Sequence, residues 1–294
     1  MDIFLQLIMS GIMTGGIYAL IALGFVVIYK ATGVFNFAQG ELVMVSAYIC
    51  WALIVQFGLP LWVSFLLTFA IAAGIGLVVE RFALRPMIGQ PLLAAMMITL
   101  ALIAVLDGIV TVIWGSRQEV LPDFFPRAPL HLGGVMISQQ LLMGFGIALA
   151  LFVAFVLFFQ RSKIGLGMRA TAEDHQVSMS LGIKVSSSFA MSWVIACIVA
   201  AVGGILLGSV NGVNMNLAFL GLKAFPVVIL GGLDSIPGAI VAGLIVGVLE
   251  KLATGYIDPL VGGGFAEIFP FIILLFVLLV RPYGLFGTKK IERI

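Results

Sequence analysis

The polar residues of this sequence that could do chemistry stand between long apolar runs. Asn36, Gln39, Gly40 and Glu41 lie in the stretch KATGVFNFAQGELVM, residues 30–44, among phenylalanine, valine and alanine. Amides beside glycines can replace part of the hydration of a polar solute, and broken helices in transporters expose backbone groups for the same purpose. The stretch therefore predicts either a broken helix beside a translocation path or a structural hinge whose amides satisfy freed backbone groups.

A second group of this kind stands in GLKAFPVVILGG, where Lys223 and Pro226 interrupt an apolar run. An ionisable residue inside a membrane span is a functional hypothesis by default, and Pro226 denies its helix a hydrogen bond. Lys223 could also snorkel to the interface or form a structural salt bridge, with Asp107 and Glu250 as candidate partners. We expect the two interruptions to flank one translocation path.

Several kinds of chemistry are not predicted. No lysine follows a glycine, so the P-loop of nucleotide-binding proteins is missing. His131 and His175 stand in separate polar segments, which does not favour a two-histidine metal site. Cys50 and Cys197 lie in apolar runs and read as small core residues. The sequence therefore predicts no catalytic, cofactor-binding or metal-binding residues, and a protein that is not an enzyme.

The elements that must position these residues are membrane helices. The chain is 62% hydrophobic and only 10% charged, with a mean hydropathy of +1.25, whereas a typical soluble domain is about 25% charged. We expect an all-α integral membrane protein, a polytopic bundle of eight or nine transmembrane helices that forms one transmembrane domain over residues 1–294. The nine candidate spans are 3–29, 41–57, 61–80, 92–115, 135–160, 187–210, 217–232, 236–253 and 265–281.

Two further patterns concern how these spans are arranged. The interruptions fall in the second and seventh spans, an odd offset that predicts opposite orientations and a possible inverted repeat. Glycines also recur at a spacing of four residues, which lets helices approach closely. They would pack this bundle internally or form an interface with a second subunit. The glycines in question are Gly11, Gly15, Gly204, Gly208, Gly212, Gly243 and Gly247.

The loop charges predict the orientation. With nine spans, eleven basic residues fall on one side of the membrane and two, Arg117 and Arg127, on the other. Positive residues mark the cytoplasmic side, so we expect a periplasmic N-terminus, a periplasmic loop over 116–134 and a cytoplasmic C-terminus. The eleven are Lys30, Arg81, Arg85, Arg161, Lys163, Arg169, Lys184, Arg281, Lys289, Lys290 and Arg293.

The segment 161–186 is the longest polar stretch, and we expect it on the cytoplasmic side. It predicts a short helix capped by Thr171, with Glu173 and Asp174 in the first turn, where negative charge favours the helix dipole. Gly182 would end this helix.

One face of the expected helix is apolar. Val177 and Leu181 stand four residues apart and would share that face. Such a helix lies on the membrane interface or docks in a groove of a cytoplasmic partner, and the spacing alone does not choose between them.

Four stretches together carry a resemblance. GGIYALIALGFVVIYKATGVFNFAQGEL, RATAEDHQVSMSLGI, GLKAFPVVILGGLDSIPGA and RPYGLFG occur in this order. They resemble the branched-chain amino acid ABC-transporter permease family, in particular its shorter, LivH-type permease. The chain departs from the family pattern at Asp234, which adds a negative charge.

The resemblance implies an importer of branched-chain amino acids in the bacterial inner membrane. It also implies a second permease subunit, two cytoplasmic ATPase subunits, a periplasmic binding protein and membrane lipid as partners, and no nucleic acid. By this resemblance, 170–182 is similar to the helix that seats in the ATPase. The coupling residues would then be Ala172, Glu173, Asp174, Val177, Leu181 and Gly182. The alternatives are a permease for urea or short amides, and a carrier or channel that works alone.

Overall fold

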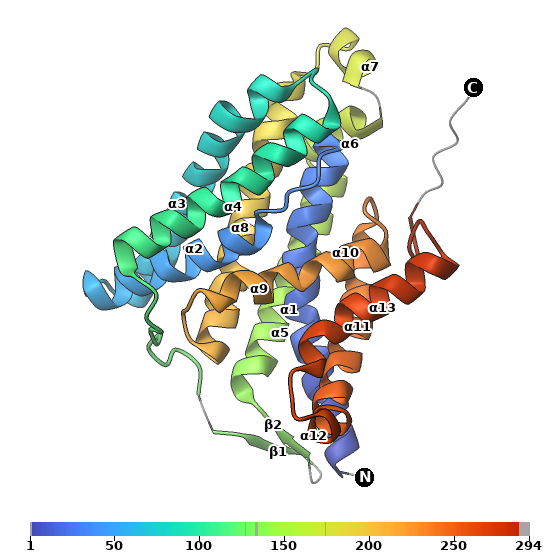
Figure 1. Cartoon of the computed structure of the whole chain (residues 1–294). Helices are drawn as coiled ribbons and strands as arrows, with labels where there is room; N and C mark the ends of the chain where they lie inside the picture. Colours follow the sequence, from blue (N-terminus) through green and yellow to red (C-terminus); the bar gives the residue numbers. More distant parts are fainter. Residues whose placement is uncertain (1, 127, 133–134, 174, 288–294) are drawn as a thin grey trace. The chain divides into compact units, whose positions relative to one another are not determined.

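The computed structural model is almost entirely helical (Figure 1). It describes residues 2–126, 128–132, 135–173 and 175–287. Of the basic residues counted above, Arg127, Lys289, Lys290 and Arg293 lie outside these ranges. The helical elements, in chain order, are α1 (Asp2–Thr32), α2 (Gln39–Trp51), η1 (Ala52–Gln56), α3 (Leu61–Val79), η2 (Glu80–Leu84), η3 (Arg85–Met87), α4 (Leu92–Trp114), α5 (Gln139–Arg161), α6 (Lys163–Glu173), α7 (His175–Ser180), α8 (Val185–Asn211), α9 (Asn216–Leu222), α10 (Ala224–Gly231), α11 (Ile236–Tyr256), α12 (Asp258–Val261) and α13 (Phe265–Val280).

Seven helical stretches of the described chain are long and apolar enough to cross a membrane. Two shorter apolar stretches, Asn216–Gly231 and Phe265–Val280, correspond to the seventh and ninth expected spans. The polytopic helical bundle predicted from composition is therefore confirmed. The seven long stretches are Ile3–Thr32, Gln39–Gln56, Leu61–Met87, Leu92–Trp114, Gln139–Arg161, Val185–Asn211 and Ile236–Tyr256.

The fifth expected span begins later than predicted. β1 (Leu130–Leu132) and β2 (Val135–Ile137) form an antiparallel pair in which Leu130 is opposite Ile137, and α5 starts only at Gln139. The apolar run that begins at Val135 is therefore shared between a strand and a helix. A short apolar run does not by itself distinguish the two.

The chain forms two compact units. The first unit comprises Met1–Val26, Asp123–Ala150 and Lys223–Ile294, and the second comprises Val27–Pro122 and Leu151–Leu222.

In the first unit, the glycine pattern brings two helices into backbone contact. Gly11 and Gly15 of α1 lie against Gly243 and Gly247 of α11, and a Cβ atom at any of the four would collide with the opposite backbone or with Ala19. These four glycines therefore pack the bundle internally, which is the first of the two expected roles. The helices α10, α11 and α13 also pack against one another in this unit.

In the second unit, α8 packs against α2 and α3, and α9 packs against α2 (Figure 1). All residues of α2 except Ile49 are buried. Gly204 of α8 lies against the Val43 carbonyl, whereas Gly212 ends α8 with a φ of 77°. Because α2 is surrounded by protein, it can carry polar side chains that a lipid-facing helix would exclude.

Candidate functional site

The first interruption separates α1 from α2. α1 ends at Thr32, and Gly33 follows with a φ of 70° while its N–H donates to the Tyr29 carbonyl at 2.7 Å. A positive φ favours glycine, which explains why the helix ends at this residue. α2 begins at Gln39, two residues before the predicted start near Glu41.

Side chains satisfy the backbone in this interruption. The Asn36 Oδ1 accepts from the Ala38 N–H at 3.1 Å, and the Asn36 Nδ2 donates to the Gln39 Oε1 at 3.1 Å. The Gln39 Nε2 in turn donates to the Ala196 carbonyl of α8 at 3.2 Å. Asn36 and Gln39 are both fully buried. Their amides thus support the broken backbone in this conformation.

Thr99 of α4 completes this support and was missed by sequence reasoning. Its hydroxyl accepts from the Phe37 N–H at 3.4 Å, and its single proton has two carbonyl acceptors within reach, Met96 of its own helix at 2.8 Å and Phe35 at 3.2 Å. Thr99 is fully buried although it lies in α4, the least buried of the seven long apolar helices of the described chain. A single threonine in an apolar span carries no distinguishing signal, because its hydroxyl normally bonds to its own helix.

Gly40 does not act as the hinge that the sequence predicted. It lies inside the first turn of α2, and the backbone of α9 at Ala218 leaves no room for a Cβ atom there. Likewise, a Cβ atom on Gly221 of α9 would lie only 3.0 Å from the Gly40 Cα. Gly40 and Gly221 therefore allow the backbone of α9 to contact the backbone at the start of α2.

A cavity of about 480 Å³ opens beside this contact. Its wall includes Gly40 and Glu41 of α2, Asp107 of α4 and Phe219 of α9. Asn36 and Gln39 do not line it. Of the residues predicted from the first interruption, Gly40 and Glu41 therefore line the cavity, whereas Asn36 and Gln39 are buried outside its wall.

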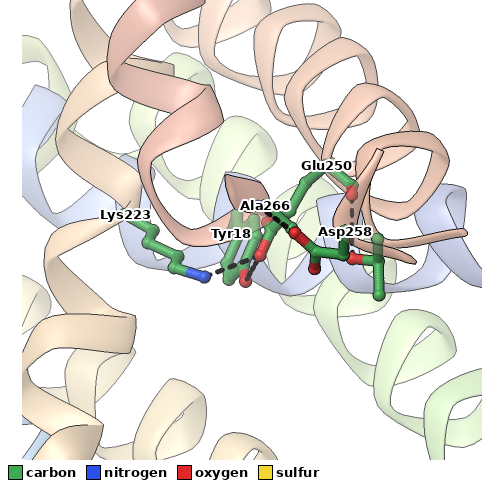
Figure 2. A network of polar contacts seen from close by, with 6 residues as sticks. Tyr18, Lys223, Glu250, Asp258 and Ala266 are labelled. Carbon is green, nitrogen blue, oxygen red and sulfur yellow. Dashed lines mark hydrogen bonds and ion pairs between the residues drawn. The ribbon is translucent and has the colours of Figure 1, made fainter. Parts of the chain in front are cut away.

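The second interruption lies at Lys223, between α9 and α10. Lys223 is 3% exposed, and its ammonium group lies 2.7 Å from the Glu250 Oε1 of α11. The Tyr18 hydroxyl donates to the same oxygen at 3.4 Å (Figure 2). Of the alternatives expected for Lys223, the structure contains the salt bridge with Glu250. It does not place the side chain at an interface.

Pro226 occupies a different position in its helix from the one expected. Because α10 begins at Ala224, Pro226 stands in the first turn, where the backbone N–H groups have no partner within the helix. The proline therefore costs α10 no hydrogen bond, and the expectation that it removes one was wrong. The helix is interrupted three residues earlier, at Lys223.

In the segment 161–186, helical structure begins at Lys163, before the predicted start at Thr171, and the described residues form α6 and α7 on either side of Asp174. Thr171 lies inside α6, where its hydroxyl bonds to the Gly167 carbonyl at 2.8 Å and to the Ser188 hydroxyl at 3.2 Å, so it is not a cap. Glu173 ends α6 and does not start a helix, and Asp174 lies outside the described residues. Ala172, beside them, is half-buried.

Of the predicted apolar pair, Val177 lies in α7 and Leu181 directly follows this helix. Val177 and Leu181 are 56% and 73% exposed. Gly182 follows with a φ of 81°, and its N–H donates to the Met179 carbonyl, so it ends the helix as predicted. α6 is held on the end of α5, because Arg169 donates to the Phe159 carbonyl. The exposed residues Val177 and Leu181 thus follow a helix, α6, that is hydrogen-bonded to α5 within the second unit.

These features define a class of protein. The described chain has seven membrane-crossing helices, two interrupted helices with buried polar residues, and no group of three histidine, cysteine, aspartate or glutamate side chains that could hold a metal ion. Interrupted helices with polar groups at membrane depth are characteristic of transport proteins. Residues 7–278 match the family described as the branched-chain amino acid transport system, permease component, and the chain belongs to this family.

Curated relatives match over nearly their whole length. The high-affinity branched-chain amino acid transport system permease protein BraD of Pseudomonas aeruginosa is 32% identical, with 99% of this chain and 98% of that protein covered. The permease protein LivH of Escherichia coli strain K12 is 33% identical with the same coverage. A probable branched-chain amino acid transport permease protein LivH of Methanocaldococcus jannaschii is 29% identical over 100% of this chain and 96% of its own.

One solved structure has a similar fold. It is titled PsaBC from Streptococcus pneumoniae in complex with Fab, and it matches with a TM-score of 0.52 at 11% identity. The match covers 94% of this chain and 92% of that one. At this identity the likeness concerns the fold alone.

Proposed function

We propose that this chain is the permease subunit of an ATP-driven importer of branched-chain amino acids in the bacterial inner membrane. The observation that carries the proposal is the family match over residues 7–278, together with curated relatives that are named as permeases of such systems and match end to end.

The transport system requires further chains in this proposal. A second permease subunit completes the path, two cytoplasmic ATPase subunits supply the energy, and a periplasmic binding protein delivers the substrate. The permease itself performs no chemical reaction. We place its N-terminus and the 116–134 loop in the periplasm and its C-terminus in the cytoplasm, because the basic residues gather on the other side of the spans from that loop.

The two interruptions lie beside the translocation path in this proposal. Gly40 and Glu41 line a cavity at the start of α2, and Asn36 and Gln39 keep the backbone open behind it. Lys223 forms the corresponding break between α9 and α10, and Pro226 stands in the first turn of α10. Buried polar groups at membrane depth support this role, since they are costly unless they serve structure or transport.

The coupling to ATP hydrolysis is assigned to 161–186. Val177 in α7 and Leu181 directly after it expose apolar side chains, and Glu173 at the end of α6 is exposed as well. An amphipathic helix with exposed apolar anchors fits a groove of a partner protein. We assign to this surface the residues predicted from the sequence: Ala172, Glu173, Asp174, Val177, Leu181 and Gly182.

Uptake by the complete system tests the proposed substrate. The chain is co-expressed with its four partner subunits and reconstituted, and ATP-dependent accumulation of leucine, isoleucine and valine is compared with that of urea and acetamide. We expect saturable uptake of the three amino acids and none of the amides. Uptake of urea without uptake of amino acids would contradict the proposal.

A further inference from the structure

Two carboxyl groups face the cavity at the start of α2. Glu41 comes from the first turn of α2 and Asp107 from the middle of α4, and the two side chains interact directly. Glu41 is 9% exposed, and its Oε2 has no hydrogen-bond partner among the described residues. The cavity wall that both acids share is therefore acidic and incompletely satisfied.

This arrangement lacks a positive charge. The other described residues of the cavity wall are apolar or uncharged, and none of them is a lysine, arginine or histidine. Ionising both of two adjacent carboxyl groups is costly when one of them is largely buried, unless a cation or a shared proton compensates the charge. The ammonium group of Lys223 does not neutralise Glu41 or Asp107, because it is paired with Glu250 in the other unit.

We propose that the Glu41–Asp107 pair binds the α-ammonium group of an amino acid as it passes through the permease. The inference rests on the function proposed above and names the group of the substrate that this cavity recognises. On binding, the ammonium replaces any proton that the pair shares, and that proton leaves to water.

The rest of the cavity matches the remainder of an apolar amino acid. Its volume of about 480 Å³ falls within the range of small-molecule sites, about 300–1,000 Å³. Phe37 and Phe219 present aromatic rings to it, and such rings attract cations as well as apolar groups. Ile103 and Leu222 add aliphatic surface for a branched side chain. The exposed Asn216 supplies an amide that can donate to a carboxylate.

Neutralising either acid tests the proposal through transport. Glu41→Gln and Asp107→Asn keep the size of each side chain and remove the charge that would hold the ammonium. We expect uptake per assembled complex to fall at least about tenfold in each, because a hydrogen bond to a charged group is worth about 1.5–3 kcal/mol. The double variant should be little worse than either single one, since the two groups act as a unit.

The matched control is Glu267→Gln, an exposed acid in the first turn of α13 that does not line the cavity. It should transport normally. If both cavity variants also transport normally in complexes that assemble in normal amounts, the pair has no role in recognition and the proposal is wrong.

A chemical probe on the unmodified complex avoids any effect of substitution on folding. Dicyclohexylcarbodiimide reacts with carboxyl groups in apolar surroundings, and mass spectrometry of the permease measures its addition to Glu41 or Asp107. Leucine and leucinamide, which carry an ammonium group, should slow the labelling. 2-Hydroxy-4-methylpentanoate, in which a hydroxyl replaces the ammonium, should leave the rate unchanged.

The remaining outcomes separate the alternatives. If sodium chloride slows the labelling as much as leucinamide does, the pair is an inorganic cation site and the proposal is overturned. If no compound slows it, the pair holds only a proton, which also overturns the proposal. A wild-type complex that takes up no branched-chain amino acid contradicts the proposed function, whereas protection by leucinamide still decides whether the pair binds an ammonium group.

Discussion

At the scale of single residues, two of the buried acids of the described chain have opposite kinds of partner. Glu250 has the ammonium group of Lys223 at 2.7 Å, whereas Glu41 has another carboxyl group beside it. A buried charge whose partner is removed is strongly destabilising, by about 3–5 kcal/mol, because it remains unpaired away from water. The two sites should therefore respond differently to neutralisation.

Lys223→Met should lower the stability of the permease. It leaves the Glu250 carboxylate buried with only the Tyr18 hydroxyl on its Oε1. We expect a loss of about 3–5 kcal/mol, seen as a reduced yield of assembled complex and a lower midpoint in a thermal-unfolding assay in detergent. Adding Glu250→Gln should recover much of the loss, because no unpaired charge then remains.

Lys251→Met is the matched control for this pair. Lys251 lies next to Glu250 on α11 but is half-exposed and lines an open cavity. Its substitution should change the midpoint little. Equal losses for Lys223→Met alone and for the double variant would show that the two charges do not stabilise each other.

The residue-level predictions from the sequence differ in how far they succeeded. Lys223 had two candidate partners, and both acids interact with predicted site residues: Glu250 with Lys223, and Asp107 with Glu41. The composition of an apolar span indicates that a charge needs a partner. It does not say which partner, because the pairing depends on how helices distant in the sequence pack.

At the scale of elements, close backbone contact determines which glycines can be replaced. Gly40→Ala should destabilise the permease, because a Cβ atom there would collide with the backbone of α9 at Ala218. Gly74→Ala in α3 should be neutral or stabilising by up to about 1 kcal/mol, since alanine favours the helix and nothing lies within 4 Å of the added atom. Thermal unfolding of the two variants should shift in opposite directions.

The exposed turn of α7 leads to a prediction about coupling. Val177→Asp and Leu181→Asp place charges on the apolar surface proposed to meet the ATPase, and each should reduce ATPase co-purification and uptake at least about tenfold. Leu260→Asp, at an equally exposed position in α12, should leave both unchanged. Normal ATPase binding in the α7 variants would contradict the assignment of this surface.

The helices of the long apolar runs could be predicted from the sequence, but the details of short segments could not. The interruption at Gly33 was predicted because glycine tolerates the positive φ that ends α1. The start of α6 at Lys163 was not, because Thr171 resembles a cap in sequence but lies inside α6 and bonds to Ser188 of α8. Tertiary contacts override local preference in such short helices.

At the scale of the whole molecule, the two ends of one helix test the orientation. Gln90 and Val120 are exposed and flank α4, whose 23 residues span about 35 Å. In a background of Cys50→Ala and Cys197→Ala, a membrane-impermeant maleimide added to intact spheroplasts should label Val120→Cys. It should label Gln90→Cys only after the membrane is opened. The reverse pattern would invert the proposed topology.

The bond between Gln39 and Ala196 has a consequence for the biogenesis of the protein. These residues are 157 positions apart in the sequence, and synthesis at about 5–20 residues per second separates their appearance by roughly 10 to 30 s. During that interval the first two helices have left the ribosome while an amide at membrane depth still lacks its acceptor. The start of α2 can therefore reach its final form only after α8 has been inserted, so the insertion of α8 completes the membrane assembly of the first two helices.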